Sequence, residues 1–248
     1  MIVHQKKVAV PDEKAKQILI EGLDSYIWEK IEVAEKAVCL TLMDKIQNGD
    51  VILTYGCSYL LQQIFLEAKK AGTMFKVVVV DGRPWKEGRE MLRSLVSVGI
   101  PCSYVLLSAA SSVMRQVNKV ILGAHALLSN GYVMSRVGVS QVALLASAHN
   151  VPVLVACETH KFCERVQSDS FVYNEMGEPD GLSQLLGGEE GPLSGWKNLP
   201  NLSLLNLSYD VTPPELVTAV ATELAVLPCT SVPVVLRVRP MEPVSCRH

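Results

Sequence analysis

The first 48 residues carry apolar positions at a helical spacing. Between residues 12 and 47, apolar side chains recur three and four positions apart, which predicts helices with one buried face (Ile27, Ile31, Ala34 and Val38). The stretch around 22–24 contains a glycine and predicts a break between two helices. Asn48-Gly49 has the composition of a helix C-cap. We therefore expect a short helical segment over residues 1–48.

From residue 50 the pattern changes to short apolar strands that alternate with amphipathic helices. The expected strands cover residues 51–55, 77–80, 103–107, 119–122, 153–156, 202–207 and 232–238. The expected helices cover residues 58–71, 86–98, 138–149 and 214–224. The strand at 77–80 is wholly apolar, which is typical of a strand buried on both faces. The alternation predicts an α/β fold over residues 49–248, a Rossmann-like open parallel sheet with helices on both faces.

Two features qualify this sheet. Residues 174–201 are rich in glycine, proline and acidic residues, and predict a long surface loop. Pro233 lies inside the last apolar run and places that expected strand at a sheet edge, because proline cannot donate to a central ladder.

Composition excludes several classes of partner. Hydrophobic residues make up 49% of the 248 residues and charged residues 19%, which favours a doubly covered sheet or a large subunit interface. The net charge of −2 gives no indication of nucleic-acid or membrane-surface binding. No apolar run approaches the roughly 20 residues that a membrane span requires. The seven cysteines form no CxxC pair, and the first residues are too polar for a signal peptide, so we expect a cytosolic protein.

Candidate chemistry lies after the expected strands, where ligands gather in open α/β sheets. Cys57 beside a helix start could be a nucleophile, although a small packing residue is favoured there. Arg83 could hold a phosphate at a helix start or belong to a capping turn. His125 could act as an acid or base, but an ordinary polar residue at a strand end is favoured.

Metal and cofactor signatures are weak. Cys157, His160 and Cys163 stand three residues apart but lack a fourth ligand, so we expect no zinc site. The chain has no GxGxxG after the first strand and no GxxxxGK[ST], GxSxG or HExxH. We therefore expect no cofactor, and a dinucleotide-dependent oxidoreductase is disfavoured.

Several motifs recur in order along the chain: DVILTYGCS at 50–58, VVVVDGRPW at 77–85, LGAHA at 122–126, VMSRVG at 133–138, HNVPVLV at 149–155, KFCERV at 161–166 and YDVTPPEL at 209–216. Together they resemble the family of regulatory subunits (alpha, beta and delta) of translation initiation factor 2B and the related sugar-phosphate isomerases. The stretches 161–166 and 231–237 are most similar to the delta branch. The resemblance extends over about residues 24–240.

This resemblance implies a regulatory role rather than catalysis. It implies a Rossmann-like domain preceded by a helical domain, of which residues 1–48 would be the last helices in a chain shorter than usual. The implied assembly is a decamer with alpha, beta, gamma and epsilon subunits that exchanges guanine nucleotide on initiation factor 2. The regulatory subunits of such an assembly sense the phosphorylated alpha subunit of factor 2. The alternative is a sugar-phosphate isomerase or a sugar-phosphate-sensing subunit of the same family.

The isomerase relatives give a test within the sequence. The resemblance places His125 where they carry a catalytic Asp, Arg136 where they carry Lys and Val139 where they carry Thr. Loss of the carboxylate removes the proton-transfer group of such an isomerisation. We therefore expect no enzyme activity and a relic ligand pocket, formed by Cys57, Arg83, His125, Asn130 and Arg136.

The late apolar runs also predict a subunit interface. The expected strand at 202–207 places leucines on both of its faces, more than one buried face requires. Aromatic and arginine side chains are the usual anchors of such surfaces. The interface candidates are Phe162, Leu202, Leu205, Leu207 and Arg237.

Overall fold

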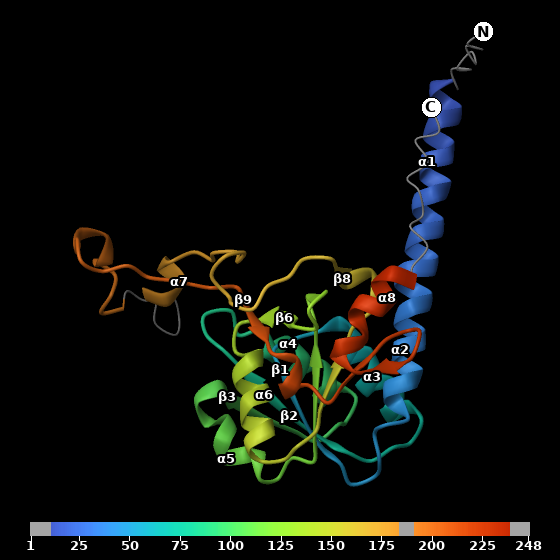
Figure 1. Ribbon diagram of the computed structural model, residues 1–248. Coiled ribbons are helices and arrows are strands. Elements are labelled where there is room, and N and C mark those ends of the chain that lie inside the picture. The colour runs from blue at the N-terminus through green and yellow to red at the C-terminus, as the bar shows by residue number, and fades with distance from the viewer. Residues whose placement is uncertain (1–10, 184–190, 239–248) are drawn as a thin grey trace.

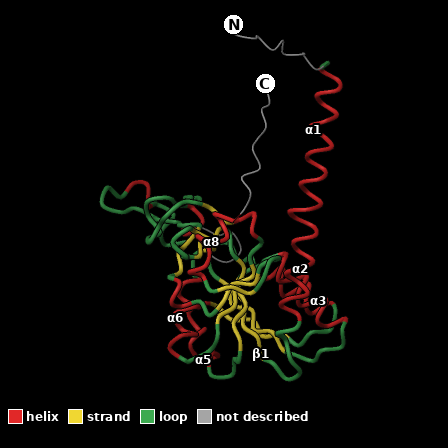
Figure 2. Tube along the Cα trace, turned by 45° about the vertical axis from the view of Figure 1, so that its right-hand side comes forward, coloured by secondary structure: helices red, strands yellow, loops and turns green. Residues whose placement is uncertain are grey.

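A computed structural model describes residues 11–183 and 191–238. A long helix leads into an α/β body (Figure 1). The long helix consists of α1 (Asp12–Tyr26), a π-helical turn η1 (Ile27–Glu32) and α2 (Val33–Met43). The predicted break at 22–24 is wrong, because the helix continues through Gly22. A glycine inside a helix costs about 1 kcal/mol of stability relative to alanine, and neighbouring residues that favour the helix can offset this cost. No residue of α1 is buried, and both views show it projecting from the body (Figure 2).

The body is organised around a seven-stranded sheet in the order β11-β10-β7-β4-β1-β2-β3. Its strands are β1 (Val51–Tyr55), β2 (Lys76–Asp81), β3 (Cys102–Leu106), β4 (Lys119–Gly123), β7 (Val153–Ala156), β10 (Ala219–Ala221) and β11 (Val226–Leu227). Every pairing is parallel except that of β10 with β11. The predicted open parallel sheet is therefore confirmed.

Helices cover both faces of this sheet, also as predicted. Helices α2, α3 (Tyr59–Lys70) and α4 (Gly88–Ser97) pack on the face that carries Val77 and Val79. Helices α5 (Ala110–Met114), α6 (Val139–Ala148) and α8 (Val232–Val238) pack on the other face, with Val78 and Val80. All four valines are buried, which explains the unbroken apolar run in β2.

A second sheet stands at the carboxyl edge of the first and was not predicted. It has the order β8-β5-β6-β9, formed by β5 (Ala126–Leu128), β6 (Val133–Arg136), β8 (Phe162–Cys163) and β9 (Tyr209–Thr212). β6 pairs antiparallel with β9, so that Ser135 lies opposite Asp210 and Arg136 opposite Tyr209. Segments far apart in the sequence therefore meet where the main sheet ends.

The last third of the chain differs from its predicted elements. Residues 202–207 form no strand, and only Leu207 makes an isolated bridge, with Met176. Instead of a helix at 214–224 there is a short 3₁₀ turn, η5 (Pro214–Leu216), followed by β10. The run at 232–238 is the helix α8, with Pro233 in its first turn, where the missing N–H costs nothing.

The long loop predicted at 174–201 contains two short elements, α7 (Asp180–Ser183) and η4 (Trp196–Asn198), while residues 184–190 lie outside the described part. Figure 1 shows these elements on an arm that extends away from the sheet. The remaining short turns are η2 (Leu107–Ala109), η3 (Thr159–Lys161) and η6 (Cys229–Ser231). A domain boundary at residue 48 stays a prediction.

Candidate functional site

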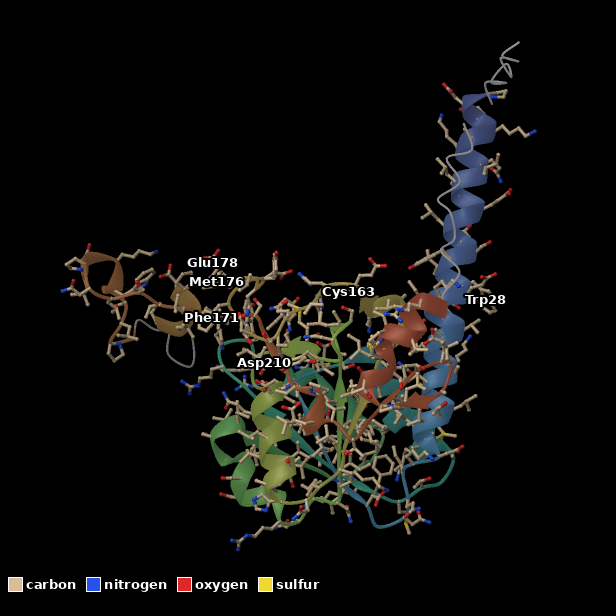
Figure 3. All side chains as sticks on the ribbon, in the orientation of Figure 1. Trp28, Cys163, Phe171, Met176, Glu178 and Asp210 are labelled. Atoms are coloured by element: carbon tan, nitrogen blue, oxygen red, sulfur yellow. The ribbon has the colours of Figure 1, made fainter. Side chains whose placement is uncertain are left out.

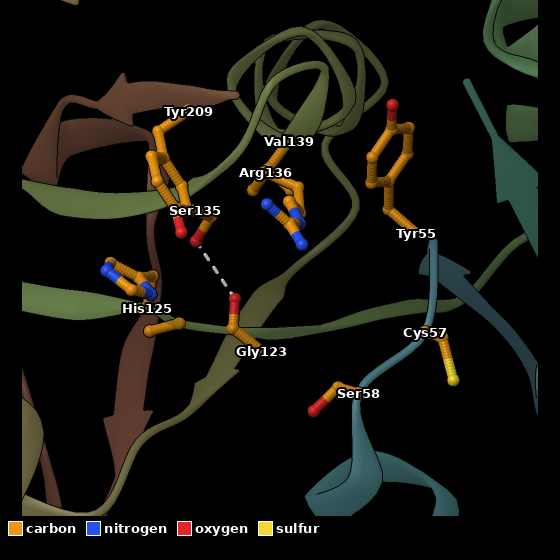
Figure 4. A pocket seen from close by; sticks show the side chains of 10 residues that line it. Tyr55, Cys57, Ser58, Gly123, His125, Ser135, Arg136, Val139 and Tyr209 are labelled. Atoms are coloured by element: carbon orange, nitrogen blue, oxygen red, sulfur yellow. Dashed lines mark hydrogen bonds between the residues drawn. The ribbon is translucent and has the colours of Figure 1, made fainter. Parts of the chain in front are cut away.

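A pocket of about 190 Å³ opens where the main sheet meets the second sheet (Figure 4). It lies at the carboxyl ends of β1 and β4, the usual ligand position in an open parallel sheet. Strands β6 and β9 close its other side. The lining residues are Tyr55, Cys57, Ser58, Gly123, Ala124, His125, Ser135, Arg136, Val139 and Tyr209.

The floor of the pocket is formed by a close approach between two strand ends. Ser58 precedes α3 as its N-cap residue but makes no side-chain capping bond. A Cβ atom on Gly123 would lie 2.9 Å from Ser58 Oγ, so only glycine fits at the end of β4. The Ser135 hydroxyl donates to the Gly123 carbonyl over 3.0 Å and fixes β6 against β4. The Ser58 hydroxyl is left to face the pocket.

A stack of side chains forms the wall on the second sheet. The rings of His125 and Tyr209 are stacked, with centroids 4.3 Å apart. Arg136 Cζ lies 5.4 Å from the centroid of the Tyr209 ring, in cation–π contact. The Arg136 guanidinium also donates to both carboxylate oxygens of Glu87, over 3.2 and 2.8 Å. This bidentate pair holds the cation of the pocket in one orientation.

Two titratable groups that were weighed for chemistry, Cys57 and His125, both have shifted pKa values. Burial raises the pKa of the Cys57 thiol, and the nearby Glu90 and Glu87 carboxylates raise it further. Cys57 is therefore a protonated thiol at neutral pH, whereas the thiolate is the nucleophile. Burial lowers the pKa of His125, and Arg136 adds to that lowering, while Glu175 opposes it. His125 is therefore a neutral imidazole at pH 7.

Asp210 lies beside this wall and supports it. Its Oδ2 accepts hydrogen bonds from the backbone N–H groups of Gly138 and Ser140, over 2.7 and 3.0 Å, at the start of α6. Burial raises the pKa of Asp210 to about 6, against the lowering effect of these two bonds. Its Oδ1 is buried without a hydrogen-bond partner among the described residues. The Tyr55 hydroxyl donates to the Val137 carbonyl over 2.7 Å and anchors the same turn.

The structure brings together three of the five residues expected in the relic pocket, Cys57, His125 and Arg136. Arg83 instead lines a neighbouring depression of about 430 Å³, to which Tyr55 also contributes. Asn130 lies in the β5–β6 turn, where its side-chain amide donates to the Gln167 carbonyl over 3.0 Å. Arg83 and Asn130 do not line the pocket with the other three.

Sequence reasoning missed three residues that shape the pocket: Tyr209, Glu87 and Asp210. Tyr209 and Asp210 stand in the YDVTPPEL stretch, which carried family resemblance but no predicted strand. Glu87 lay inside the expected helix 86–98, and the structure places it directly before α4 as the N-cap residue. The pairing of β6 with β9 brings Tyr209 and Asp210 to this wall, and the ion pair with Arg136 brings Glu87 there.

The interface candidates are scattered rather than gathered on one strand. Phe162 is buried in β8, and Leu202 and Leu207 are half-buried. Leu205 is 61% exposed, and Arg237 is exposed on α8. No strand runs through residues 202–207. The predicted subunit interface therefore stays a prediction, and two of its candidate residues, Leu205 and Arg237, are exposed.

The pocket combines one paired cation, a neutral imidazole, a protonated thiol and hydroxyl groups. Its lining residues include no carboxylate. Such a set can bind a small anion or a polyol, but it lacks a charged base for proton abstraction. In the described part of the chain, no three His, Cys, Asp or Glu residues gather in a way that could hold a metal ion. The helices described there are also too short or too polar to cross a membrane.

Fold and pocket together define a Rossmann-like α/β protein with a small polar pocket at the strand ends. The sequence matches the Initiation factor 2 subunit family (IF-2B) over residues 2–229, and the chain belongs to that family.

Three similar proteins refine the comparison. The chain is 45% identical over 233 residues to "Translation initiation factor eIF2B subunit delta" of Schizosaccharomyces pombe, covering 92% of this chain and 50% of that protein. It is 35% identical over 184 residues to "Ribose 1,5-bisphosphate isomerase" of Pyrococcus furiosus, covering 74% of this chain and 55% of that one. A crystal structure of the tetrameric eIF2B-beta2-delta2 complex from C. thermophilum matches with a TM-score of 0.73 and 31% identity, covering 86% of this chain and 63% of that chain. The chain thus spans about half the length of the curated relatives it matches.

Proposed function

We propose that this chain is a regulatory, non-catalytic subunit of the guanine nucleotide exchange factor for translation initiation factor 2. The observation that carries the proposal is the 45% identity to a delta subunit over 92% of this chain. Because that alignment covers only 50% of the relative, the role is inferred from the shared half. The absence of a carboxylate from the pocket lining supports a subunit without isomerase chemistry.

The partners in this proposal are other subunits of the exchange factor, with a beta-type subunit as the direct one. Support comes from the beta2-delta2 complex, whose chain has the same fold as this one. The proposal extends to the alpha, gamma and epsilon subunits and to the phosphorylated alpha subunit of factor 2, in the cytosol. It includes no nucleic acid or membrane, and the near-neutral charge of −2 is consistent with that.

Co-expression with a beta-type subunit tests the assembly step. The tagged chain should co-purify with that subunit in equal amounts. The variant Leu144→Ser, an exposed change on α6, should co-purify equally well and serves as the control for surface substitutions. In the reconstituted factor, GDP release from factor 2 should depend on the chain and should fall when phosphorylated alpha subunit is added. A chain that stays monomeric beside its partner, with exchange unaffected by its removal, would contradict the proposal.

A second candidate is a subunit that senses a sugar phosphate. It is favoured by the retained pocket with Arg136 and by the 35% identity to a ribose 1,5-bisphosphate isomerase. Thermal unfolding with ribose 1,5-bisphosphate tests it, since ligand at a hundred times its Kd should stabilise by about 2.7 kcal/mol. A shift in Tm that disappears in Arg136→Ala would favour sensing. If Tm does not shift, the sensing role is refuted and only the assembly role remains.

A further inference from the structure

A groove of about 670 Å³ lies between α2 and α3, away from the strand-end pocket, with which it shares no lining residue. Each of its walls is a stripe along one helix, at the spacing of three and four that places side chains on one face. The end of η1 and α2 contribute Glu32, Glu35, Lys36, Cys39, Leu40 and Met43. Helix α3 contributes Tyr59, Gln63 and Glu67.

The groove has apolar lining residues that are open to solvent. Leu40 is 62% exposed and Tyr59 64% exposed, although each stands one turn or less from residues of the core. Trp28, labelled on the long helix in Figure 3, extends this surface at one end and is 54% exposed. Large apolar side chains gathered in this way are typical of a surface that another molecule covers.

The rim of the groove has an excess of negative charge. Three carboxylates line it, from Glu32, Glu35 and Glu67, against the single cation of Lys36. The Lys36 ammonium lies 5.0 Å from the centroid of the Trp28 ring.

Only one of the three carboxylates has an ion-pair partner among the described residues. Glu67 pairs with Lys70 over 2.6 Å, whereas Glu32 and Glu35 pair with none. Burial raises the pKa of Glu35 and the nearby Glu158 carboxylate raises it further, while Lys161 and Lys36 lower it. The lining of the groove therefore carries more negative than positive charge, three carboxylates against the one ammonium of Lys36.

We propose that the groove between α2 and α3 binds an amphipathic helix of another polypeptide, with apolar side chains on one stripe and Lys or Arg beside them. From Glu32 to Met43 the wall extends over eleven residue steps, or about 16 Å, which matches three turns of a partner helix. The apolar stripe would cover Leu40 and Tyr59, and the basic residues would meet Glu32 and Glu35. A second copy of this chain fits poorly, because a two-fold contact would place the two acidic rims together.

A synthetic helix tests this chemistry on the full chain. The probe is a 16-residue peptide with leucines at helical spacing and lysines on both flanks of that stripe. Two matched peptides carry glutamate in place of every lysine or the same residues in scrambled order. Methyl NMR of Leu40 and Met43 reports where the peptide binds, and the shifts against peptide concentration give Kd.

The basic helix should shift the Leu40 and Met43 methyl signals, and the two matched peptides should not. Leu40→Ser should weaken binding by about tenfold or more, because it removes the central apolar contact. Leu144→Ser, a change at a similarly exposed leucine (58%) on the opposite face of the sheet, should leave Kd unchanged. The double variant Glu32→Gln, Glu35→Gln should weaken binding about fivefold and reduce its salt dependence.

Three results would overturn the proposal: equal binding of the glutamate peptide, methyl shifts that avoid Leu40 and Met43, or insensitivity to Leu40→Ser. A photo-crosslinker placed at position 40 in cells, with position 144 as control, tests the natural occupant. Crosslinks to basic amphipathic segments of another chain would support the proposal. Crosslinks to a second copy of this chain, or to acidic or non-helical segments alone, would refute it.

Discussion

Asp210→Asn tests how a buried carboxylate supports the turn beside the pocket. The side chain accepts two backbone hydrogen bonds at the start of α6, and its pKa is raised by burial from 3.8 to about 6. A carboxyl group whose pKa is higher in the folded state holds its proton more tightly there than in the unfolded chain. Its contribution to stability is therefore complete below pH 3.8 and is lost as the pH rises through about 6.

The magnitude follows from the shift. About two pKa units correspond to roughly 3 kcal/mol, and about 2 kcal/mol of this falls between pH 4.5 and pH 7. The asparagine variant keeps an oxygen that can accept from Gly138 and Ser140 but has no charge to bury. The free energy of unfolding of the native chain, minus that of the variant, should therefore fall by about 2 kcal/mol over this range.

Urea unfolding followed by circular dichroism, at half-unit steps from pH 4.5 to pH 7, measures this difference. Subtracting the free energy of unfolding of the variant from that of the native chain cancels the contribution of the other carboxylates, which titrate alike in both proteins. A difference that stays flat, or that rises with pH, would show that Asp210 is not held in a charge-penalising environment. The reasoning on the turn at Gly138 would then be wrong.

Three further changes have expected outcomes. Leu122→Ala removes a side chain that is 1% exposed in β4 and should lower the free energy of unfolding by about 2–5 kcal/mol in the same urea assay. Gly138→Ala should lower it by about 1–3 kcal/mol, because φ is +108° and the new Cβ would lie 2.5 Å from the Tyr55 hydroxyl; an unchanged midpoint would contradict this turn geometry. Leu205→Glu should leave stability within about 0.5 kcal/mol, since the side chain is 61% exposed, but should weaken co-purification with a beta-type subunit; undiminished pairing would remove Leu205 from the interface.

The main sheet could be predicted because its strands carry a strong local signal. The runs at 51–55 and 153–156 begin and end within a residue of the strands β1 and β7. Both are mostly apolar because helices cover both faces of the sheet, so that the centre of each strand is buried on both sides. The helix at 59–70 was also expected, since its apolar residues recur at a spacing of three and four.

The last third could not be predicted because its apolar runs are short and ambiguous. The run at 232–238 is rich in valine and favours a strand, yet it packs as α8 on the main core. A seven-residue apolar run fits either a buried strand or a buried helix, and the surface that it meets decides between them. In the same way, leucines at 202–207 suggested a strand, but the pairing partner β6 accepts residues 209–212 instead.

The candidate site was predicted in part for a similar reason. Cys57 and His125 follow neighbouring strands, β1 and β4, and parallel strands bring their carboxyl ends together. Arg83 follows β2, one strand further along, and lines a neighbouring depression instead of the pocket. The wall formed by Tyr209 depends on a second sheet that joins the β5–β6 hairpin to β8 and β9, far along the chain, and no local pattern in the sequence indicates that sheet.

The contacts around Arg136 limit what the pocket can bind. Its guanidinium is shared between the Glu87 carboxylate and the Tyr209 ring, so its charge is already compensated. An anionic ligand would have to draw Arg136 away from Glu87, or bind beside a neutral ion pair, and either cost lowers affinity. With about 190 Å³, the pocket is also smaller than the roughly 300 Å³ at which small-molecule sites begin.

A sugar phosphate should therefore bind more tightly to Glu87→Gln than to the native chain, because the substitution frees Arg136 for the ligand. Calorimetry with ribose 1,5-bisphosphate measures both affinities, and tighter binding by the native chain would show that Glu87 helps to position Arg136 for a ligand.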